Sequence, residues 1–456
     1  MIVMARKHDM PHASAGLRLV VGLGATGRSC LTWLDRRGCR LRVVDSRDLP
    51  PERAVIDTLN RRPETRFGGL DLSALEGVSE VVVSPGVPLE EPLITAARRA
   101  GIPVVGDIEL FARAVSRPVA AITGSNGKST VTTLVARMAE AAGRSTLAGG
   151  NLGTPALDLL AEPAPDLYVL ELSSFQLELT ASLRAKAAVV LNLSADHIDR
   201  HGSLERYAAA KARIYDHAET AIANRDDPAA ARLAPAGGNT VTFGLDAPPS
   251  DRDFGVVTDD VGAAWLCRGQ ERLVAAAGIA LRGGHNLANV LAAMAMGEAL
   301  GLATSPMVAA AGEFAGLPHR MRRVHSAGGV DWIDDSKATN VGAAAAALAG
   351  TARPIVLVAG GDAKGANLDA LAEAARGRVK AAVLLGQDAD RLEAVLGGVA
   401  PVVTVTTLEQ AVEAAAGLAM PGDVVLLSPA CASTDMFRDY RERGDCFARL
   451  AREVAP

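Results

Sequence analysis

The sequence is poor in features that several classes of protein require. Its 456 residues include 5 cysteines and no C-x-x-C pair, so neither a disulfide framework nor a structural zinc site is expected. Aromatic residues make up 3% of the chain, the formal net charge is −5, and no long run of lysine and arginine occurs. The chain therefore has few residues that could stack on bases or neutralise a phosphate backbone, which argues against a nucleic-acid partner.

Long hydrophobic runs are also lacking. No apolar stretch reaches the roughly 18 residues of a membrane span, and the opening MIVMARKHDMPHASAG has no apolar run after Arg6 and Lys7. We therefore expect neither a membrane span nor a secretory signal. Because scattered cysteines fit a reducing compartment, the expected location is the cytoplasm.

The remaining sequence has the rhythm of an α/β protein. Short β-branched runs, for example at 19–21, 119–122 and 330–333, alternate with helical stretches rich in alanine, leucine and arginine. The chain is too long for one hydrophobic core. We expect three α/β domains, at 1–106, 107–316 and 317–456.

Two segments stand out from this rhythm by composition. Residues 235–255 are rich in glycine, proline and aspartate, and we expect a surface insertion there. The alanine-rich segment GAAAAALAG (342–350) is expected to be a helix packed closely on a sheet.

The first motif is LVVGLGATG, which places Gly22, Gly24 and Gly27 in G-x-G-x-x-G spacing after an expected strand, with Asp45 ending the next strand. These glycines permit a tight turn and a close approach of phosphate, and the acid can accept a ribose hydroxyl. The motif alone supports either an NAD-dependent oxidoreductase or a related domain that holds another phosphate ligand.

The second motif is AITGSNGKST (121–130), between an expected strand and an expected helix. The usual nucleotide loop has a glycine at the position of Ile122, so the standard pattern fails. Backbone amides at a helix N-terminus can nevertheless bind phosphate, with Lys128 neutralising its charge and Ser129 or Thr130 binding Mg²⁺. The alternative is a capped strand-to-helix turn without a ligand.

Acidic and histidine side chains follow the next two expected strands. Glu171 ends one strand, where a carboxylate can bind Mg²⁺. His197 and His201 follow the other with i, i+4 spacing, beside Asp196 and Asp199. A zinc hydrolase is one interpretation, but the glutamate of H-E-x-x-H and a third ligand are missing. We favour His197 as a magnesium ligand or orienting group.

A helix is predicted at GGHNLANVLAAM (283–294). Asn286 is expected to cap its N-terminus, and Asn289 lies one turn further along.

Polar loops follow three expected strands of the last domain: DDSKATN (334–340), GGDAKG (360–365) and LLSPACASTD (426–435). The carboxyl ends of parallel strands meet at one edge of a sheet, so we expect one crevice, in which Lys337 and Lys364 capture an anionic substrate. Each lysine taken alone could equally be a solvated surface charge.

In order along the chain, TGSNGKST, ELSSFQLE, DHIDRHG, HNLAN, GLPHR, DDSKATN, GGDAKG and SPACAS resemble the Mur ligase family over essentially the whole sequence. ELSSFQLE, DSKATN and SPACAS resemble its glutamate-adding branch. The resemblance implies an ATP-dependent ligase that adds D-glutamate to UDP-N-acetylmuramoyl-L-alanine through an acyl phosphate, in the cytoplasmic synthesis of peptidoglycan precursors. It also implies a Rossmann-like first domain (1–106) that holds the uridine nucleotide and a central P-loop mononucleotide-binding domain (107–316) that holds ATP and two Mg²⁺ ions. The third domain (317–456) is then Rossmann-like and holds the amino acid.

Individual residues gain expected roles from the same resemblance. Residues around ATP are Gly124, Asn126, Gly127, Lys128, Ser129, Thr130, Asn286, Asn289, Arg320 and Asp335. Residues around the UDP-linked substrate are Thr26, Asp45, Ser46, Arg47, Gly86, Asn151 and Ser173. Residues around glutamate are Lys337, Thr339, Lys364, Ser433 and Tyr440. Metal ligands are Ser129, Glu171, His197 and Lys211, the last if carbamylated, and the catalytic set is Lys128, His197, Lys211 and Lys337.

Residue chemistry alone would not have selected Lys211, because a lysine within YAAAKARIY is typical of an exposed helix face. The sequence also departs from the family at Ser46, where threonine is frequent, and at Tyr440, where phenylalanine is common. Both changes conserve shape. Three substrates on three domains imply closure, with a hinge expected near Pro318, and a monomer is the default expectation.

Three alternatives stay open at this stage. An NAD-dependent oxidoreductase would leave the phosphate loop without a task. A ligase related to folylpolyglutamate synthase shares that loop and the glutamate chemistry, but not the N-terminal UDP-binding domain or SPACAS. A nucleotide-binding regulatory protein would not catalyse a reaction. The residues do not decide between D- and L-glutamate.

Overall fold

The computed structural model describes residues 16–281 and 283–454. The chain forms two compact units. The first runs to Thr123 and also contains 143–188 and 210–220, and the second contains 124–142, 189–209 and 221–456. The opening residues 1–15, in which no signal is expected, lie outside the described residues. Among those described, no helix is both long and apolar enough to cross a membrane.

The first unit begins with a parallel sheet in the order β3-β2-β1-β4-β5. Its central strands are rich in valine because helices pack on the sheet, as when Leu93 and Ile94 of α2 lie against Val81 and Val83. The elements are β1 (Leu17–Val21), α1 (Ala25–Asp35), β2 (Arg40–Asp45), η1 (Arg53–Thr58), β3 (Glu64–Phe67), η2 (Leu72–Leu75), β4 (Val78–Val83), α2 (Pro92–Arg99), β5 (Val104–Val105) and α3 (Asp107–Ala114).

The rest of the first unit is built on three parallel strands with β8 in the middle. Asp158 connects this part to α1, because its carboxylate accepts hydrogen bonds from Arg28 Nη2 at 2.9 Å and Ser29 Oγ at 2.6 Å. The elements are β6 (Val119–Thr123), β7 (Thr146–Gly150), α5 (Ala156–Leu159), β8 (Leu167–Glu171), α6 (Ser174–Glu178) and η3 (Arg213–Tyr215).

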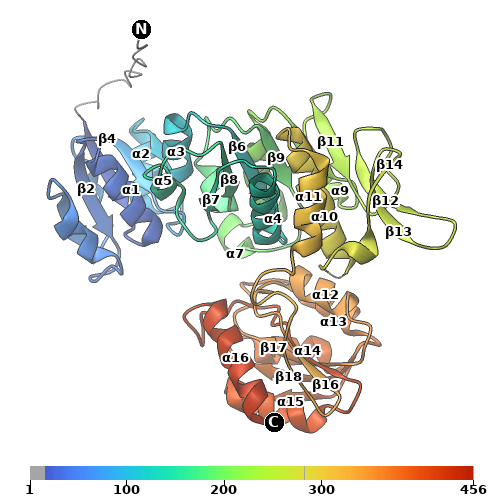
Figure 1. Ribbon diagram of the computed structural model, residues 1–456. Helices are drawn as coiled ribbons and strands as arrows, with labels where there is room; N and C mark the ends of the chain where they lie inside the picture. Colours follow the sequence, from blue (N-terminus) through green and yellow to red (C-terminus); the bar gives the residue numbers. More distant parts are fainter. Residues whose placement is uncertain (1–15, 282, 455–456) are drawn as a thin grey trace. The chain divides into compact units, whose positions relative to one another are not determined.

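The second unit contains α4, which packs against α10 and α11 (Figure 1). The expected surface insertion at 235–255 is wrong in part, because Thr240–Phe243 forms β11, parallel to β10, with Val241 and Phe243 buried. This short strand alternates partly buried and buried residues, and the glycines and prolines on either side of it made the pattern difficult to detect in the sequence. The elements are α4 (Lys128–Ala141), α7 (Ile198–His201), β10 (Ala221–Asn224), α9 (Pro228–Ala231), β11, β12 (Phe254–Thr258), β13 (Ala264–Arg268), β14 (Glu271–Ala275), η4 (Ala276–Gly278), α10 (Gly284–Ala299) and α11 (Thr304–Glu313). Two further elements, β9 (Ala187–Val190) and α8 (Leu204–Ala212), run from one unit into the other along the chain.

The last part of the second unit is a sheet in the order β15-β16-β20-β17-β18-β19, parallel except for the β15–β16 pair. Alternate residues of β20 enter two cores: Leu426 packs beneath α12 to α14, and Val425 packs beneath α15 and α16. The alanine-rich segment forms α12, as predicted. The elements are β15 (Arg322–Ala327), β16 (Val330–Asp334), α12 (Val341–Ala349), β17 (Ile355–Gly360), α13 (Asp369–Ala375), β18 (Val379–Leu385), α14 (Ala389–Leu396), β19 (Val402–Thr404), α15 (Leu408–Leu418), β20 (Val424–Leu427) and α16 (Tyr440–Val454).

Candidate active site

The phosphate-loop motif forms a tight turn between β6 and α4. Ile122 is fully buried inside β6, so the position of the usual first glycine belongs to the strand and the loop is shorter than the standard one. Gly127 caps α4 with φ of 83°, a conformation that favours glycine. A Cβ atom at Gly127 would lie 2.4 Å from Asn289 Oδ1. Both local conformation and crowding therefore require glycine at this position.

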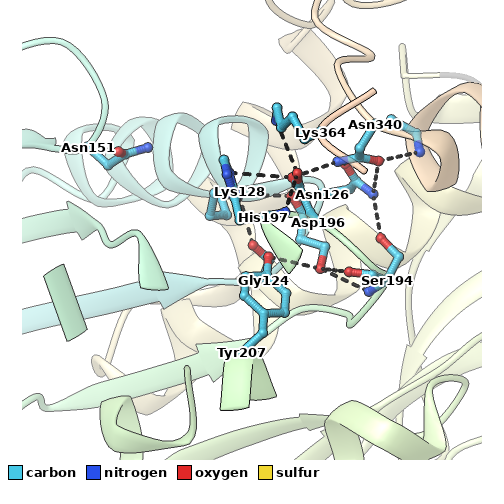
Figure 2. Close-up of polar contacts among 12 residues, drawn as sticks. Gly124, Asn126, Lys128, Asn151, Ser194, Asp196, His197, Tyr207, Asn340 and Lys364 are labelled. Carbon is cyan, nitrogen blue, oxygen red and sulfur yellow. Dashed lines mark hydrogen bonds and ion pairs between the residues drawn. The ribbon is translucent and has the colours of Figure 1, made fainter. Parts of the chain in front are cut away.

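Lys128 is the first residue of α4, and its side chain curls back over the loop (Figure 2). Its Nζ atom donates to the carbonyl oxygens of Gly124 at 2.8 Å and Ser125 at 2.9 Å. The next residue, Ser129, is buried, and its Oγ atom accepts a hydrogen bond from Arg320 Nη2 at 3.3 Å. The loop thus places a cation and a hydroxyl at the N-terminus of a long helix, which is the chemistry that binds phosphate.

A network of amides and hydroxyls supports the loop from behind (Figure 2). Asn126 N donates to Asn192 Oδ1 at 2.8 Å, and Asn126 exchanges side-chain hydrogen bonds with Asn340 at 3.1 and 3.3 Å. Ser125 Oγ donates to the carbonyl of Ser194 and lies 3.2 Å from Tyr207 Oη. Burial raises the pKa of Tyr207 above its usual value, so this phenol stays protonated. Asn126 is expected beside ATP from the sequence, whereas no role is predicted for Asn192, Ser194, Tyr207 and Asn340.

Asp196 lies beside this network and binds a lysine from the far end of the chain. Its Oδ1 atom is 3.1 Å from Lys364 Nζ, and Asn340 Nδ2 donates to its Oδ2 atom at 3.2 Å. Burial opposes the charged carboxylate, but the positive charges of Lys364 and Lys128 hold the pKa of Asp196 below its usual value. The carboxylate is therefore ionised.

The two histidines of SADHIDRHG have different surroundings. His197 caps α7 in the left-handed conformation, with φ of 53°. Burial lowers the pKa of His197 to about 4, so its imidazole is neutral at pH 7 and can act as a metal ligand. His201 is almost completely buried and packs edge-on against Tyr207, with ring centroids 5.2 Å apart.

Two expected metal ligands lie in the first unit. Glu171, at the end of β8, is buried, with Oε1 accepting from Asn151 Nδ2 at 2.7 Å and Oε2 lacking a hydrogen-bond partner. Lys211 is 1% exposed, and its Nζ atom donates to Thr123 Oγ1 at 3.2 Å. The exposed helix face that residue chemistry favours for Lys211 is wrong, because the fold buries this side chain against Thr123, which is distant in the sequence. Ser173, expected near the UDP-linked substrate, caps α6 and accepts from Gln176 N at 3.2 Å.

A cavity of about 370 Å³ in the second unit gathers most of the expected ATP residues. It lies between α10 and α12, so the alanine-rich helix forms one wall. The expected residues that line it are Asn126, Gly127, Thr130, Asn286, Asn289, Arg320 and Asp335. The prediction that Asn286 caps α10 is wrong, because the helix already begins at Gly284 and its N-cap is Gly283. Asn286 lines the cavity instead, and its Oδ1 atom accepts a hydrogen bond from Asn289 Nδ2 at 3.4 Å.

Asp335 is the most strongly perturbed acid of this cavity. Ser428 Oγ donates to its Oδ2 atom at 2.8 Å, and Met321 N donates to its Oδ1 atom at 3.2 Å. Burial raises the pKa of Asp335 to about 7. This side chain can therefore exist as a neutral acid near physiological pH.

A second cavity, of about 520 Å³, lies in the first unit and gathers the expected uridine residues Thr26, Asp45, Ser46, Arg47 and Gly86. Arg47 donates to both oxygens of Asp45, and Leu23 N donates to Oδ2 at 2.7 Å. The hydrogen bond from Arg47 lowers the pKa of Asp45 to about 2. All four acceptor sites of this carboxylate are engaged, which leaves little for the ribose contact that the NAD interpretation needs.

The three polar loops of the last sheet meet, as predicted, because β16, β20 and β17 are neighbours in the sheet. Lys337 Nζ lies 3.8 Å from the ring centroid of Tyr440, a cation–π contact. Ser433 is buried in the third loop, and Thr339 follows Lys337 in the first. Lys364, in the second, holds φ of 52°.

The expected metal ligands are divided between the units. Glu171 and Lys211 belong to the first, and Ser129 and His197 belong to the second. Across residues 16–281 and 283–454, no three His, Cys, Asp or Glu side chains cluster closely enough to hold a metal ion.

Comparison with known proteins gives a consistent result along the chain. A model of the Mur ligase MurD-like N-terminal domain matches residues 17–106, the Mur ligase middle domain matches 122–297, and the Mur ligase glutamate ligase domain matches 319–431. Among solved structures, the UDP-N-acetylmuramate-alanine ligase MurC from Thermotoga maritima superimposes with a TM-score of 0.60 at 18% identity, over 96% of this chain and 99% of its own. MurF from Acinetobacter baumannii gives a TM-score of 0.59 at 18% identity, over 97% and 92%. The expected three-domain α/β fold class is confirmed.

Curated relatives are closer in sequence. The UDP-N-acetylmuramoylalanine--D-glutamate ligase of Nitrosococcus oceani is 50% identical over 442 residues, which cover 96% of this chain and 97% of the relative. The enzyme of the same name from Pseudomonas aeruginosa is 47% identical over 450 residues, 97% of this chain and 99% of the relative. With such identity over nearly its whole length, this chain belongs to the Mur ligase family.

Proposed function

We propose that this protein joins D-glutamate to UDP-N-acetylmuramoyl-L-alanine in an ATP-driven reaction, as a cytoplasmic step in the synthesis of peptidoglycan precursors. One observation carries the proposal. The chain is 50% identical over nearly its whole length to a UDP-N-acetylmuramoylalanine--D-glutamate ligase, and it has a phosphate loop at the N-terminus of α4. The NAD-dependent and folylpolyglutamate synthase-like alternatives have no comparable support.

The reaction needs ATP because a carboxylate oxygen is a poor leaving group. Transfer of the γ-phosphoryl group to the alanine carboxylate gives an acyl phosphate and ADP. The glutamate amine then attacks the acyl carbon, the bond from that carbon to the phosphate oxygen breaks, and phosphate leaves as the amide forms. Catalysis of phosphoryl transfer rests mainly on positioning and on stabilisation of charge.

Lys128 is the residue proposed to stabilise that charge. Its Nζ atom donates to carbonyl oxygens of its own loop, and a phosphate entering the loop would give the ammonium a charged acceptor, which forms stronger hydrogen bonds than a carbonyl. The proposed nucleotide pocket is the cavity beside the loop, with Asn286, Asn289 and Arg320 on its walls. Asp335 is proposed to bind the nucleotide from the opposite side.

Magnesium fits the oxygen donors available in the two units. Glu171 presents a buried Oε2 atom without a hydrogen-bond partner, which a hard cation would satisfy. We propose Ser129, Glu171, His197 and a carbamylated Lys211 as the ligands of two Mg²⁺ ions. When bound, the metal neutralises charge on the phosphates. Carbamylation would join CO₂ to the amine of buried Lys211 and turn it into a donor of carboxylate-like oxygens, which Mg²⁺ prefers.

The remaining residues are proposed to hold the other two substrates. The cavity around Asp45 and Arg47 would take the uridine nucleotide, and Asn151 and Ser173 would contact the muramoyl part. Lys337, Lys364 and Ser433 would bind glutamate, with Thr339 and Tyr440 beside them. The proposed domain boundaries are 1–106, 107–316 and 317–456, with the hinge near Pro318.

A phosphate-release assay tests the proposal. The protein is given ATP, Mg²⁺ and UDP-N-acetylmuramoyl-L-alanine, with D-glutamate, L-glutamate, meso-diaminopimelate or no amino acid. We expect sustained release with D-glutamate and a product heavier by one glutamyl residue in mass spectrometry. Equal rates in all four arms would contradict the assignment of D-glutamate, and no release in any arm would contradict a ligase.

A further inference from the structure

Arg443, on α16, binds three separate loops at once. Its Nε atom donates to Ser336 Oγ at 3.0 Å. Nη2 donates to the carbonyl oxygens of Ser336 at 2.9 Å and Cys431 at 3.2 Å, and Nη1 donates to those of Gly360 at 3.3 Å and Ala432 at 3.4 Å. A guanidinium has five N–H groups, so each of them has an acceptor.

The three loops are those proposed to bind glutamate. Ser336 directly precedes Lys337, and Ala432 directly precedes Ser433. Gly360 opens the GGDAKG segment, which carries Lys364. One rigid side chain therefore links the ends of β16, β17 and β20 on the side of the sheet where the expected substrate contacts lie.

Burying the Arg443 guanidinium costs folding free energy that a purely structural contact would not require. Arg443 is 3% exposed. Asp334 and Asp435 attract its charge, but among the described residues no acidic side chain lies close enough to form an ion pair with it. Burial lowers the pKa of Arg443 to about 10, which still leaves the group charged at pH 7. Burying an unpaired cation destabilises a fold, and an apolar side chain would avoid that cost.

We propose that Arg443 is a positioning residue for the amino acid substrate. It fixes the three loops relative to one another, so that Lys337, Lys364 and Ser433 can all contact one bound amino acid molecule. Ser336 Oγ extends the contact by donating to the carbonyl of Tyr440 at 2.8 Å, whose ring faces Lys337. The inference rests on the glutamate site proposed above.

The test compares Arg443→Lys with Ser336→Ala. Lysine keeps the charge but cannot reach all five acceptors, and alanine removes only the acceptor of Nε and the bond to Tyr440. We expect Arg443→Lys to raise the KM for D-glutamate about tenfold or more, because small displacements of positioning groups are costly. Formation of the acyl phosphate without glutamate, trapped as a hydroxamate, should stay within about twofold of wild type. Ser336→Ala should give a smaller rise, and the double variant should resemble Arg443→Lys alone.

Arg353→Lys is the matched control. Arg353 also bridges carbonyl oxygens, those of Gly329, Gly422 and Asp423, but at the opposite ends of the same strands. The Arg353→Lys substitution should lower the free energy of unfolding without changing the KM for D-glutamate. An unchanged KM in Arg443→Lys, or an equal loss of acyl phosphate formation and glutamate use, would overturn the inference. Failure of wild type itself to use D-glutamate would instead contradict the proposed function.

Discussion

Lys364 Nζ lies 3.1 Å from Asp196 Oδ1, and this ion pair joins the loop after β17 to the segment that leads into α7. Both side chains are largely buried, and Asn340 holds the second oxygen of Asp196. Lys364 also adopts φ of 52°, a backbone conformation that costs a non-glycine residue about 1 kcal/mol. The position of this ammonium group is thus fixed beside the network that supports the phosphate loop.

We predict that Lys364→Met raises the KM for D-glutamate by about ten- to a hundredfold, since a charge-assisted hydrogen bond to a carboxylate is lost. Steady-state kinetics with saturating ATP and nucleotide substrate measure the change. Lys380→Met is the control, because Lys380 forms a similar ion pair with buried Asp423, at 2.7 Å, away from the three loops. A similar rise in both variants would argue against a specific glutamate contact.

A second prediction concerns Lys128→Ala. Its Nζ atom donates to the carbonyl oxygens of Gly124 and Ser125, and we expect the ammonium to move to the transferring phosphoryl group. Removing one preorganised charge-stabilising donor should lower kcat about a hundredfold or more. Lys186→Ala, which breaks an exposed ion pair with Glu219, should leave kcat within about twofold of wild type. Near-normal turnover of Lys128→Ala would exclude the proposed role.

Residues at strand ends were the most predictable part of the candidate site. Local pattern places Glu171 at the end of β8 and Lys337 after β16, because apolar runs define the strands that precede them. The same pattern failed for Lys211, whose burial depends on packing between segments far apart in the sequence. It also gave no role to Arg443, because its five acceptors come from three loops that only the folded sheet brings together.

Asp335 should make the stability of the unliganded protein depend on pH. Its pKa is about 7 in the folded state and close to 3.8 when unfolded. The folded state binds the proton more tightly, so the stabilisation is complete below pH 4 and is lost as pH rises to about 7. Asp335→Asn lacks this titration.

From pH 5 to pH 8, the difference in unfolding free energy between wild type and Asp335→Asn should therefore shift by on the order of 2 kcal/mol in favour of the variant. Urea denaturation at the two pH values measures this shift. A constant difference would show that Asp335 has the same affinity for protons in the folded and unfolded states.

Gly127→Ala should separate crowding from backbone strain at the phosphate loop. Gly127 has φ of 83°, and an added Cβ atom would lie 2.4 Å from Asn289 Oδ1. Gly143, one residue after the C-cap of α4, has nearly the same φ, 80°, but nothing within 4 Å of an added Cβ atom. Both alanine variants should lose about 1 to 2 kcal/mol through strain. Only Gly127→Ala should also push Asn289 out of the cavity. ATP should therefore no longer raise the Tm of Gly127→Ala, but it should still raise the Tm of Gly143→Ala. Equal protection of the two variants by ATP would mean that the nucleotide does not use this loop.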